Sequence, residues 1–164
     1  MKILVDADSC PKPARDAIVR AIQRTKVPGI FAANRKIPGI EGPLCTMELC
    51  ENREGAADDR IVALAKPGDL VVTRDIPLAS RLVERAISVI DDRGRTYTKE
   101  NIRERLSLRD FMISLAESGL GSERISNYGK KELKAFADGF DRELQRLLRA
   151  AHLTSFIHAR DTDP

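Results

Sequence analysis

Two aspartates near the N-terminus, Asp6 and Asp8, are the residues of this chain best placed to do chemistry. The apolar run Ile3–Val5 before them predicts a buried strand, which ends in a turn before a helix entered through Pro11. Side chains two residues apart on an extended segment point the same way, so both carboxylates can converge above the strand's end. An acid at the mouth of an apolar strand must be paired, solvated or bound to a cation. The pair therefore predicts a cation site at the edge of a sheet, although a helix cap explains Asp8 equally well.

Further acids follow the other expected strands. Asp75 comes after Leu70–Val72, and Asp91 comes after Ile87–Ile90. Strands that alternate with helices through short connections require right-handed crossovers, which bring the carboxyl ends of the strands to one side of the sheet. We therefore expect the acids to cluster there. The alternative for Asp75 is a capping role at the start of the next helix.

One more acid is placed by helix geometry. On the helix expected over 55–65, Asp58 lies roughly 65° from the centre of the apolar stripe, whereas Asp59 lies nearly opposite that centre. Asp58 can thus flank the sheet, and Asp59 faces water. Asp58 could instead be a first-turn acid that complements the helix dipole.

Several carboxylates close together repel one another, and a divalent cation removes that conflict. Oxygen ligands with retained waters suit Mg²⁺ or Mn²⁺, and such an ion can activate water and stabilise charge on a phosphodiester. Both histidines, His152 and His158, are far from these motifs in the sequence. The acids therefore predict a Mg²⁺ or Mn²⁺ site that works without a histidine base.

A basic segment follows the last expected strand. Between residues 93 and 109 the chain has six basic residues and only two acidic ones, Glu100 and Glu104. The basic residues are Arg93, Arg95, Lys99, Arg103, Arg105 and Arg109. Phosphate contact through such a cluster would bind RNA or DNA. A solvated helical face with ion pairs between neighbouring turns explains the same residues.

Composition favours one globular domain. The chain has 164 residues, of which 42% are hydrophobic, and no run is long and apolar enough for a transmembrane helix. Three cysteines without metal-site spacing argue against a disulfide framework and against zinc. We expect a cytoplasmic protein with a domain over 1–153, no membrane contact, and a disordered tail over 154–164.

The pattern of apolar residues predicts alternating strands and helices. Strands are expected at the N-terminus and over 29–33, 44–49, 69–75 and 87–90. Helices are expected over 12–25, 55–65 and from Ile76, then as two short helices over 98–106 and 107–115, and as a long one over 131–151.

Many runs of the sequence closely resemble the YaiI/YqxD family of bacterial proteins over about Met1 to Gly119. They are Val5–Pro11, Ala33–Asn34, Ala57–Asp58, Gly68–Ala79, Arg93–Gly94, Tyr97–Thr98, Asn101–Leu106 and Arg109–Met112. The resemblance implies a PIN-like fold, a three-layer α/β domain with a central, mostly parallel sheet of about five strands and a helical C-terminal extension.

Proteins with PIN domains are typically nucleases that hold Mg²⁺ or Mn²⁺ with three or four acids. Carried over by position, the resemblance assigns the metal to Asp6, Asp58 and Asp75, with Asp91 as a fourth acid. Asp8 joins them from its spacing to Asp6, and Asp6 and Asp75 are the expected catalytic residues. The expected nucleic-acid contacts are Asn34, Arg93, Arg103, Arg105 and Arg109.

A metal-dependent nuclease acting on RNA or DNA is thus the leading hypothesis. A nucleic-acid-binding or adaptor protein without catalysis is the first alternative. The second is a phosphatase, because Asp6-x-Asp8 also resembles the opening motif of haloacid-dehalogenase-type enzymes, in which the first aspartate is the nucleophile. Against the phosphatase, Cys10 replaces the usual threonine, and no lysine lies between the fourth and fifth expected strands.

Overall fold

A computed structural model describes residues 1–40, 42–119 and 128–160, with side chains described as far as residue 153. Its middle layer is a six-stranded sheet made of β1 (Ile3–Asp6), β2 (Gly29–Ala33), β3 (Cys45–Leu49), β4 (Leu70–Val72), β5 (Ser88–Ile90) and β6 (Thr96–Tyr97). The helices are α1 (Lys12–Thr25), α2 (Ala56–Leu64), α3 (Ile76–Glu84), α4 (Ile102–Glu117) and α5 (Lys130–Arg160). None of the described helices is long and apolar enough to cross a membrane.

The strand order is β3-β2-β1-β4-β5-β6, with β1 to β5 parallel and β6 antiparallel to β5. The chain builds outward from β1 in one direction through β2 and β3, and then in the other direction through β4 and β5. The order therefore reverses between β1 and β4. In open α/β sheets, the crevice outside the carboxyl ends of two such strands is the usual place for a ligand.

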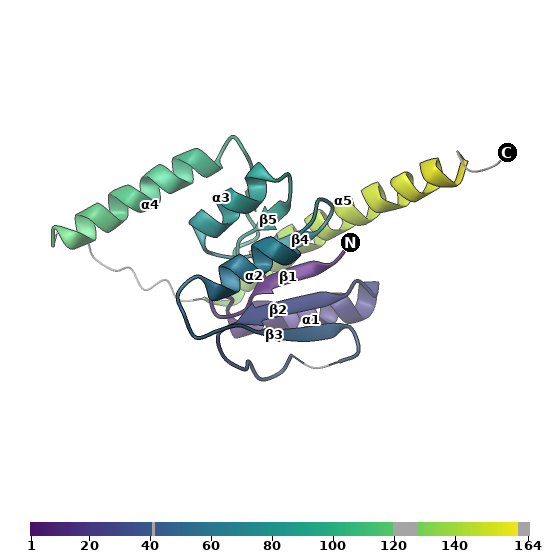
Figure 1. The fold of residues 1–164 in the computed structure, drawn as a ribbon, viewed down its shortest axis with the longest axis horizontal. Helices are drawn as coiled ribbons and strands as arrows, with labels where there is room; N and C mark the ends of the chain where they lie inside the picture. Colours follow the sequence, from purple (N-terminus) through teal and green to yellow (C-terminus); the bar gives the residue numbers. More distant parts are fainter. Residues whose placement is uncertain (41, 120–127, 161–164) are drawn as a thin grey trace.

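Helices cover both faces of the sheet, so the domain has three layers (Figure 1). Successive side chains of a strand point to opposite faces of the sheet, so each face has its own hydrophobic core. On β1, Ile3 and Val5 pack with α1 and α5, whereas Leu4 packs with α2 and α3. Phe136 of α5 and Phe31 of β2 are fully buried on the first face. Burial of both faces holds β1 rigidly, so the residue at its carboxyl end is held in a fixed place.

The expected mostly parallel α/β sheet is confirmed, with a sixth strand added. β6 has only two residues, too few to give a periodic pattern. The expected fourth strand was too long, because the chain turns after Val72 and Asp75 already caps α3. The PIN-like assignment stays a prediction.

The C-terminal part differs more from the expected elements. The two short helices expected over 98–106 and 107–115 are one helix, α4, since Ser107 continues the helix instead of ending it. α5 continues to Arg160, beyond the expected end at 151, so most of the expected disordered tail is helical. Residues 161–164 lie outside the described residues.

Two glycines allow α5 to lie against the turn between β5 and β6. A Cβ atom on Gly94 would lie 2.2 Å from the backbone oxygen of Ala135, and a Cβ on Gly139 would lie 2.2 Å from the backbone oxygen of Gly94. The Tyr128 hydroxyl adds a hydrogen bond of 2.8 Å to the backbone oxygen of Asp92 in the same turn. Close backbone contact at this turn therefore anchors the long C-terminal helix to the sheet.

Candidate functional site

Asp6 lies at the carboxyl end of β1, next to the point where the strand order reverses. Its side chain is buried, with 6% of the residue exposed. The Oδ2 atom accepts hydrogen bonds from the Ser9 hydroxyl at 2.6 Å and from the Thr73 hydroxyl at 2.9 Å. The pKa of Asp6 is raised, mainly because the carboxyl group is buried and also because the charge of Asp75 is near. The two hydroxyl hydrogen bonds lower the pKa in part. Two neutral hydroxyls orient this carboxylate without neutralising its charge.

Asp75 reaches the same crevice from the turn after β4. Its Oδ1 atom accepts a hydrogen bond of 2.6 Å from the Leu78 backbone N–H, which caps the start of α3. Its own backbone N–H donates to the Thr73 hydroxyl at 3.0 Å. Thr73 thus connects Asp6 and Asp75 through one hydroxyl group. The capping role expected as the alternative for Asp75 is real, and it leaves the carboxylate beside Asp6.

Asp58 approaches these two acids from the first turn of α2, which packs over β1 and β2. Burial and the charges of Asp75 and Asp6 raise the pKa of Asp58 to about 6, and Arg81 lowers it. Within the described part of the chain, no hydrogen bond or ion pair reaches the Asp58 carboxylate. Three acids from separate elements therefore repel one another at the end of β1.

This repulsion predicts how stability depends on pH. A carboxyl group whose pKa is raised in the folded state binds more protons there than in the unfolded chain, so it lowers stability as pH rises from about 4 to about 6. We expect Asp58→Asn to match the parent near pH 4. Above pH 7 it should be more stable by about 1 kcal/mol, a value reduced for solvent screening. Urea unfolding at several pH values measures this difference.

Asp59→Asn is the matched control. Arg81 and Arg53 bind the Asp59 carboxylate and lower its pKa, so its charge favours the folded state. The control should lose stability relative to the parent as pH rises, opposite in sign to Asp58→Asn. Parallel pH profiles for the two variants would contradict the assigned repulsion at Asp58.

The Asp8 carboxylate is held by residues that follow β2. Its Oδ2 atom accepts a hydrogen bond of 2.7 Å from the Asn34 backbone N–H, and its Oδ1 atom lies 3.4 Å from Arg35 Nε. Asp8 therefore ties the turn after β1 to the end of β2. Its role as a metal ligand stays a prediction, which this geometry does not favour.

Asn34 bridges the end of β2 to the loop before α2. Its side-chain nitrogen lies 3.5 Å from the backbone oxygen of Arg53. Its side-chain oxygen is buried and has no hydrogen-bond partner among the described residues. The expected contact of Asn34 with nucleic acid stays a prediction.

Asp91 is occupied by the turn between β5 and β6. Its Oδ1 atom accepts hydrogen bonds from the backbone N–H groups of Arg93 at 2.9 Å and Arg95 at 2.8 Å, and its Oδ2 atom lies 3.2 Å from Arg95 Nε. The neighbouring Asp92 is also buried, and its Oδ2 atom lies 3.5 Å from Arg74 Nε. Asp91 as a fourth metal ligand stays a prediction, and its present contacts give it a structural role.

The basic residues are divided among different roles. Arg105 stacks over the Tyr97 ring, with its guanidinium carbon 5.1 Å from the ring centre. Arg109 Nη1 lies 3.0 Å from Asp110 Oδ1. Arg103 is exposed on the first turns of α4, and Arg93 lies in the β5–β6 turn. Their expected contacts with RNA or DNA stay predictions, and Arg105 already has a packing role.

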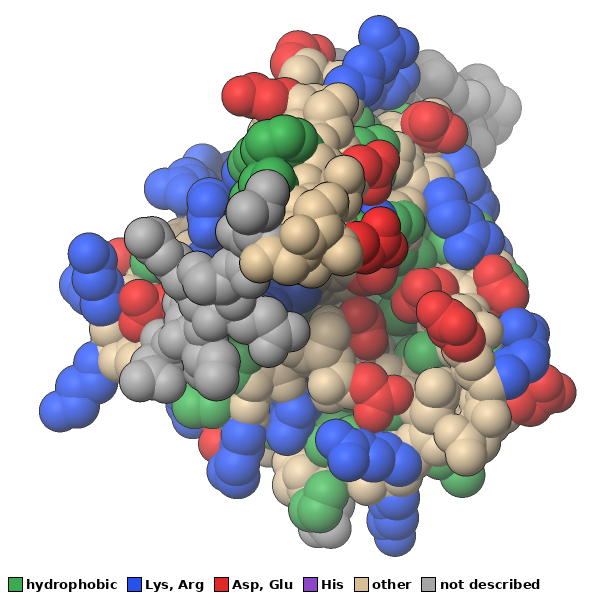
Figure 2. All heavy atoms as spheres, turned by 90° about the vertical axis from the view of Figure 1, so that its left-hand side faces the viewer, with side chains coloured by type: hydrophobic (Ala, Val, Ile, Leu, Met, Phe, Trp, Pro, Cys, Tyr) green, Lys and Arg blue, Asp and Glu red, His purple; other side chains and the backbone are tan. Residues whose placement is uncertain are grey.

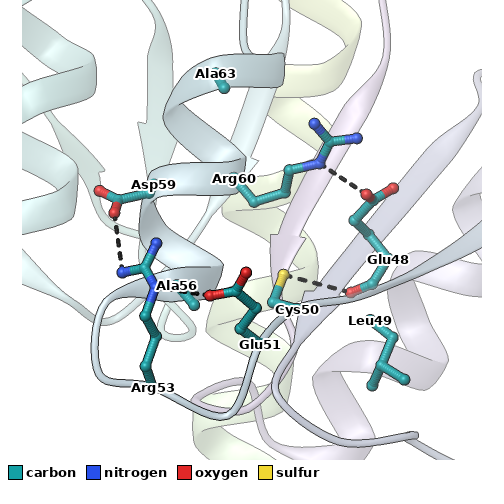
Figure 3. A pocket seen from close by; sticks show the side chains of 9 residues that line it. All are labelled: Glu48, Leu49, Cys50, Glu51, Arg53, Ala56, Asp59, Arg60 and Ala63. Atoms are coloured by element: carbon teal, nitrogen blue, oxygen red, sulfur yellow. Dashed lines mark hydrogen bonds and ion pairs between the residues drawn. The ribbon is translucent and has the colours of Figure 1, made fainter.

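A pocket of about 350 Å³ lies elsewhere, between α2 and the edge strand β3 (Figure 3). Its three acids are paired with arginines: Asp59 and Glu51 with Arg53, and Glu48 with Arg60 at 2.7 Å. Asp59 belongs to the face of α2 that turns away from Asp6. This pocket is therefore separate from the repelling carboxylates.

Metal binding can be tested against the donors present. Asp6, Asp58 and Asp75 offer carboxylate oxygens only, the donors that Mg²⁺ and Mn²⁺ prefer. Acidic side chains gather down the middle of the face that shows the carboxyl ends of the strands, with Lys and Arg mostly around its rim (Figure 2). Yet no three His, Cys, Asp or Glu side chains in the described part of the chain are arranged to hold a metal ion. The cluster fits a hard cation in charge and donor type, and binding would require the carboxylates to move closer together.

Sequence reasoning missed three residues that shape the site. The Ser9 hydroxyl, in the turn after β1, donates a hydrogen bond to the Asp6 carboxylate. Thr73 stands two residues before Asp75. Because side chains two residues apart on an extended segment point the same way, this spacing could have placed Thr73 at the same edge of the sheet. Arg81, one turn into α3, lowers the pKa of Asp58, and only the packing of α3 against α2 reveals this.

Comparison with known proteins identifies the class. The family model described as "Uncharacterized BCR, YaiI/YqxD family" matches residues 4–146, so the chain belongs to the YaiI/YqxD family. It is 50% identical over 151 residues to a UPF0178 protein of Treponema pallidum, covering 92% of this chain and 85% of the relative. A UPF0178 protein of Treponema denticola is 46% identical over 94% of this chain and 99% of the relative. For a UPF0178 protein of Myxococcus xanthus, the identity is 44%, over 91% and 97%. No solved structure gives a significant match.

Proposed function

We propose that this protein is a metal-dependent nuclease whose Mg²⁺ or Mn²⁺ is held by Asp6, Asp58 and Asp75. The observation that carries the proposal is the unpaired Asp58 carboxylate beside two further acids. Its pKa is raised because burial and the charges of Asp75 and Asp6 all oppose its ionisation. A structural acid would be expected to have a basic partner, as Asp59 has in Arg81 and Arg53. A divalent cation is the counter-charge that this cluster lacks.

Residues around such an ion would orient its carboxylate ligands. Ser9 and Thr73 hold Asp6 in one orientation, and the α3 cap holds Asp75 through one oxygen and leaves the other for a ligand. The ion would supply an activated water and stabilise charge on a phosphate oxygen. The bases at the rim of this face would attract a polyanion. These features together favour a phosphodiester as substrate.

Metal binding is tested by thermal unfolding. An ion that binds only the folded state stabilises it by about 2.7 kcal/mol at a hundredfold excess over its dissociation constant. For a domain of this size, that corresponds to a rise in melting temperature of about 5–10 °C. We expect this rise with Mn²⁺, and a smaller one with the same concentration of Ca²⁺, because the ligand set is small. An unchanged melting temperature at millimolar Mn²⁺ would remove the metal from the proposal.

Activity separates the proposal from its alternatives. In the presence of Mn²⁺, a labelled single-stranded RNA or DNA should be cut, and p-nitrophenyl phosphate should not be hydrolysed. Hydrolysis of p-nitrophenyl phosphate alone would indicate a phosphatase with Asp6 as nucleophile. Binding of the oligonucleotide without cleavage would indicate a nucleic-acid-binding or adaptor protein.

A further inference from the structure

Arg74 occupies the turn after β4, which borders the carboxylates of the candidate site. It lies between Thr73, whose hydroxyl donates to the Asp6 carboxylate at 2.9 Å, and Asp75, which caps α3. The Arg74 side chain is 54% exposed, and its Nε atom lies 3.5 Å from the Asp92 Oδ2 atom. A half-exposed positive charge therefore stands next in sequence to two residues of the site.

The Arg74 side chain extends from this turn toward the β5–β6 turn, where Asp92 lies. Tyr128, just before α5, donates a hydrogen bond to the Asp92 backbone oxygen and packs against the core on the α1 and α5 face. Asp58 instead belongs to α2, which packs on the other face of the sheet. A chain laid across the turn after β4 would thus meet the carboxylates on one side and the Arg74 guanidinium on the other.

Asp92 holds the Arg74 guanidinium in place. Asp92 is 4% exposed, and the hydrogen bond of 2.8 Å from Tyr128 fixes its backbone. Burial raises the pKa of Asp92, and the charge of Arg74 lowers it. A guanidinium has five N–H donors in a planar fork, and no hydrogen bond to a described residue uses those of Arg74. The ion pair therefore orients the guanidinium and leaves donors for a ligand.

A polynucleotide needs a positive charge close to the acids. Three carboxylates with one divalent cation would keep one net negative charge, which repels the phosphates beside the cleaved bond. Arginine binds phosphate through two parallel N–H···O bonds. Arg81 also acts on the carboxylates, but it is bonded to Asp59 at 3.1 Å. Arg74 is therefore better placed than Arg81 to receive a phosphate.

We propose that Arg74 binds the phosphate next to the one at the carboxylates, on a strand of RNA or DNA that crosses the turn after β4. Asp92 is a positioning residue that holds the guanidinium for this contact. The place of the cleaved phosphate rests on the proposed nuclease function, whereas binding at Arg74 needs neither metal nor cleavage. The substrate is then a strand with at least two phosphates, and not a mononucleotide.

Fluorescence anisotropy with a labelled single-stranded oligonucleotide, in EDTA and at several salt concentrations, measures binding without cleavage. Arg74→Gln should weaken binding about tenfold and reduce the slope of log affinity against log salt by about 0.7, the value for one phosphate of a single strand. Arg24→Gln is the matched control. Arg24 is 59% exposed and paired with Asp141, but it lies in the last turn of α1, which leads to the amino end of β2. This control should bind like the parent.

Asp92→Asn separates a positioned guanidinium from a general attraction of charge. The variant has one more net positive charge, so general attraction predicts tighter binding, whereas loss of the oriented guanidinium predicts weaker binding than in the parent. The double variant Arg74→Gln/Asp92→Asn keeps the net charge of the parent and leaves no unpaired buried acid. It should therefore stay folded, with a melting temperature close to that of the parent, and still bind as weakly as Arg74→Gln.

Cleavage distinguishes this contact from the metal site. With Mn²⁺, Arg74→Gln should raise KM for the oligonucleotide and keep the metal-induced rise in melting temperature, since Arg74 is not a ligand of the ion. A parent that binds through Arg74 without cutting would contradict the nuclease function and support the phosphate contact. Parent-like binding by the double variant, or no binding by the parent, would overturn the role of Arg74. Tighter binding by Asp92→Asn would overturn the role of Asp92.

Discussion

Asp75→Asn is expected to keep the fold and lose the metal response together with any nuclease activity. Asparagine caps a helix about as well as aspartate, so the hydrogen bond to the Leu78 N–H is retained and stability changes by a few tenths of a kcal/mol at most. Removing one negative charge also relieves the repulsion on Asp58 and Asp6. The metal-free variant should therefore be as stable as the parent or more stable. With Mn²⁺, its rise in melting temperature should shrink, and cleavage should fall by about a hundredfold or more.

Melting curves and cleavage rates of three proteins decide this prediction. They are the parent, Asp75→Asn and Asp59→Asn, each with and without Mn²⁺. Asp59 is paired with arginines on the outer face of α2, so Asp59→Asn should keep the full metal response. A parent-like response in Asp75→Asn would show that Asp75 is only a helix cap. Loss of the response in both variants would indicate non-specific binding to surface charge.

The sequence was sufficient for the parts of the site that local patterns determine. The apolar run before Asp6 and the run before Asp75 are buried on both faces, which is why both strands and both acids could be placed. Helix periodicity separated Asp58 from Asp59, and the structure pairs only Asp59 with bases. These predictions depended on residues close to one another in the chain.

Long-range contacts determine the parts that could not be predicted. The position of Asp8 depends on the backbone N–H of Asn34, 26 residues away. The sequence places Asp91 at the end of a strand, but it does not show that the Asp91 carboxylate accepts hydrogen bonds from the backbone N–H groups of Arg93 and Arg95. Leu108 and Phe111 are exposed on α4, whereas Ile102 is buried, so the apolar residues of this helix do not follow a single buried stripe. Spacing alone does not distinguish an acid that binds a ligand from one that holds a turn.

The packing of α5 predicts the largest effect of a single substitution on stability. Gly139 lies inside α5, where alanine normally stabilises a helix by up to about 1 kcal/mol relative to glycine. Here the added methyl group would lie 2.2 Å from the Gly94 backbone oxygen, so α5 must move away from the turn. We expect Gly139→Ala to lower the free energy of unfolding by about 2 kcal/mol, the reverse of helix propensity. Urea unfolding measures the change.

Gly94 and Gly68 separate this close approach from backbone strain. Gly94 has a φ of +79°, and its Cβ would lie 2.2 Å from the Ala135 backbone oxygen, so Gly94→Ala combines both costs and should lose about 3 kcal/mol or more. Gly68 has a similar φ of +91° with nothing within 4 Å, so Gly68→Ala should lose only about 1 kcal/mol. The expected order of stability is therefore parent, Gly68→Ala, Gly139→Ala, Gly94→Ala. If Gly139→Ala were instead more stable than the parent, α5 would not contact the β5–β6 turn at this distance. The turn that holds Asp91 and Asp92 would then lack the support that α5 gives it.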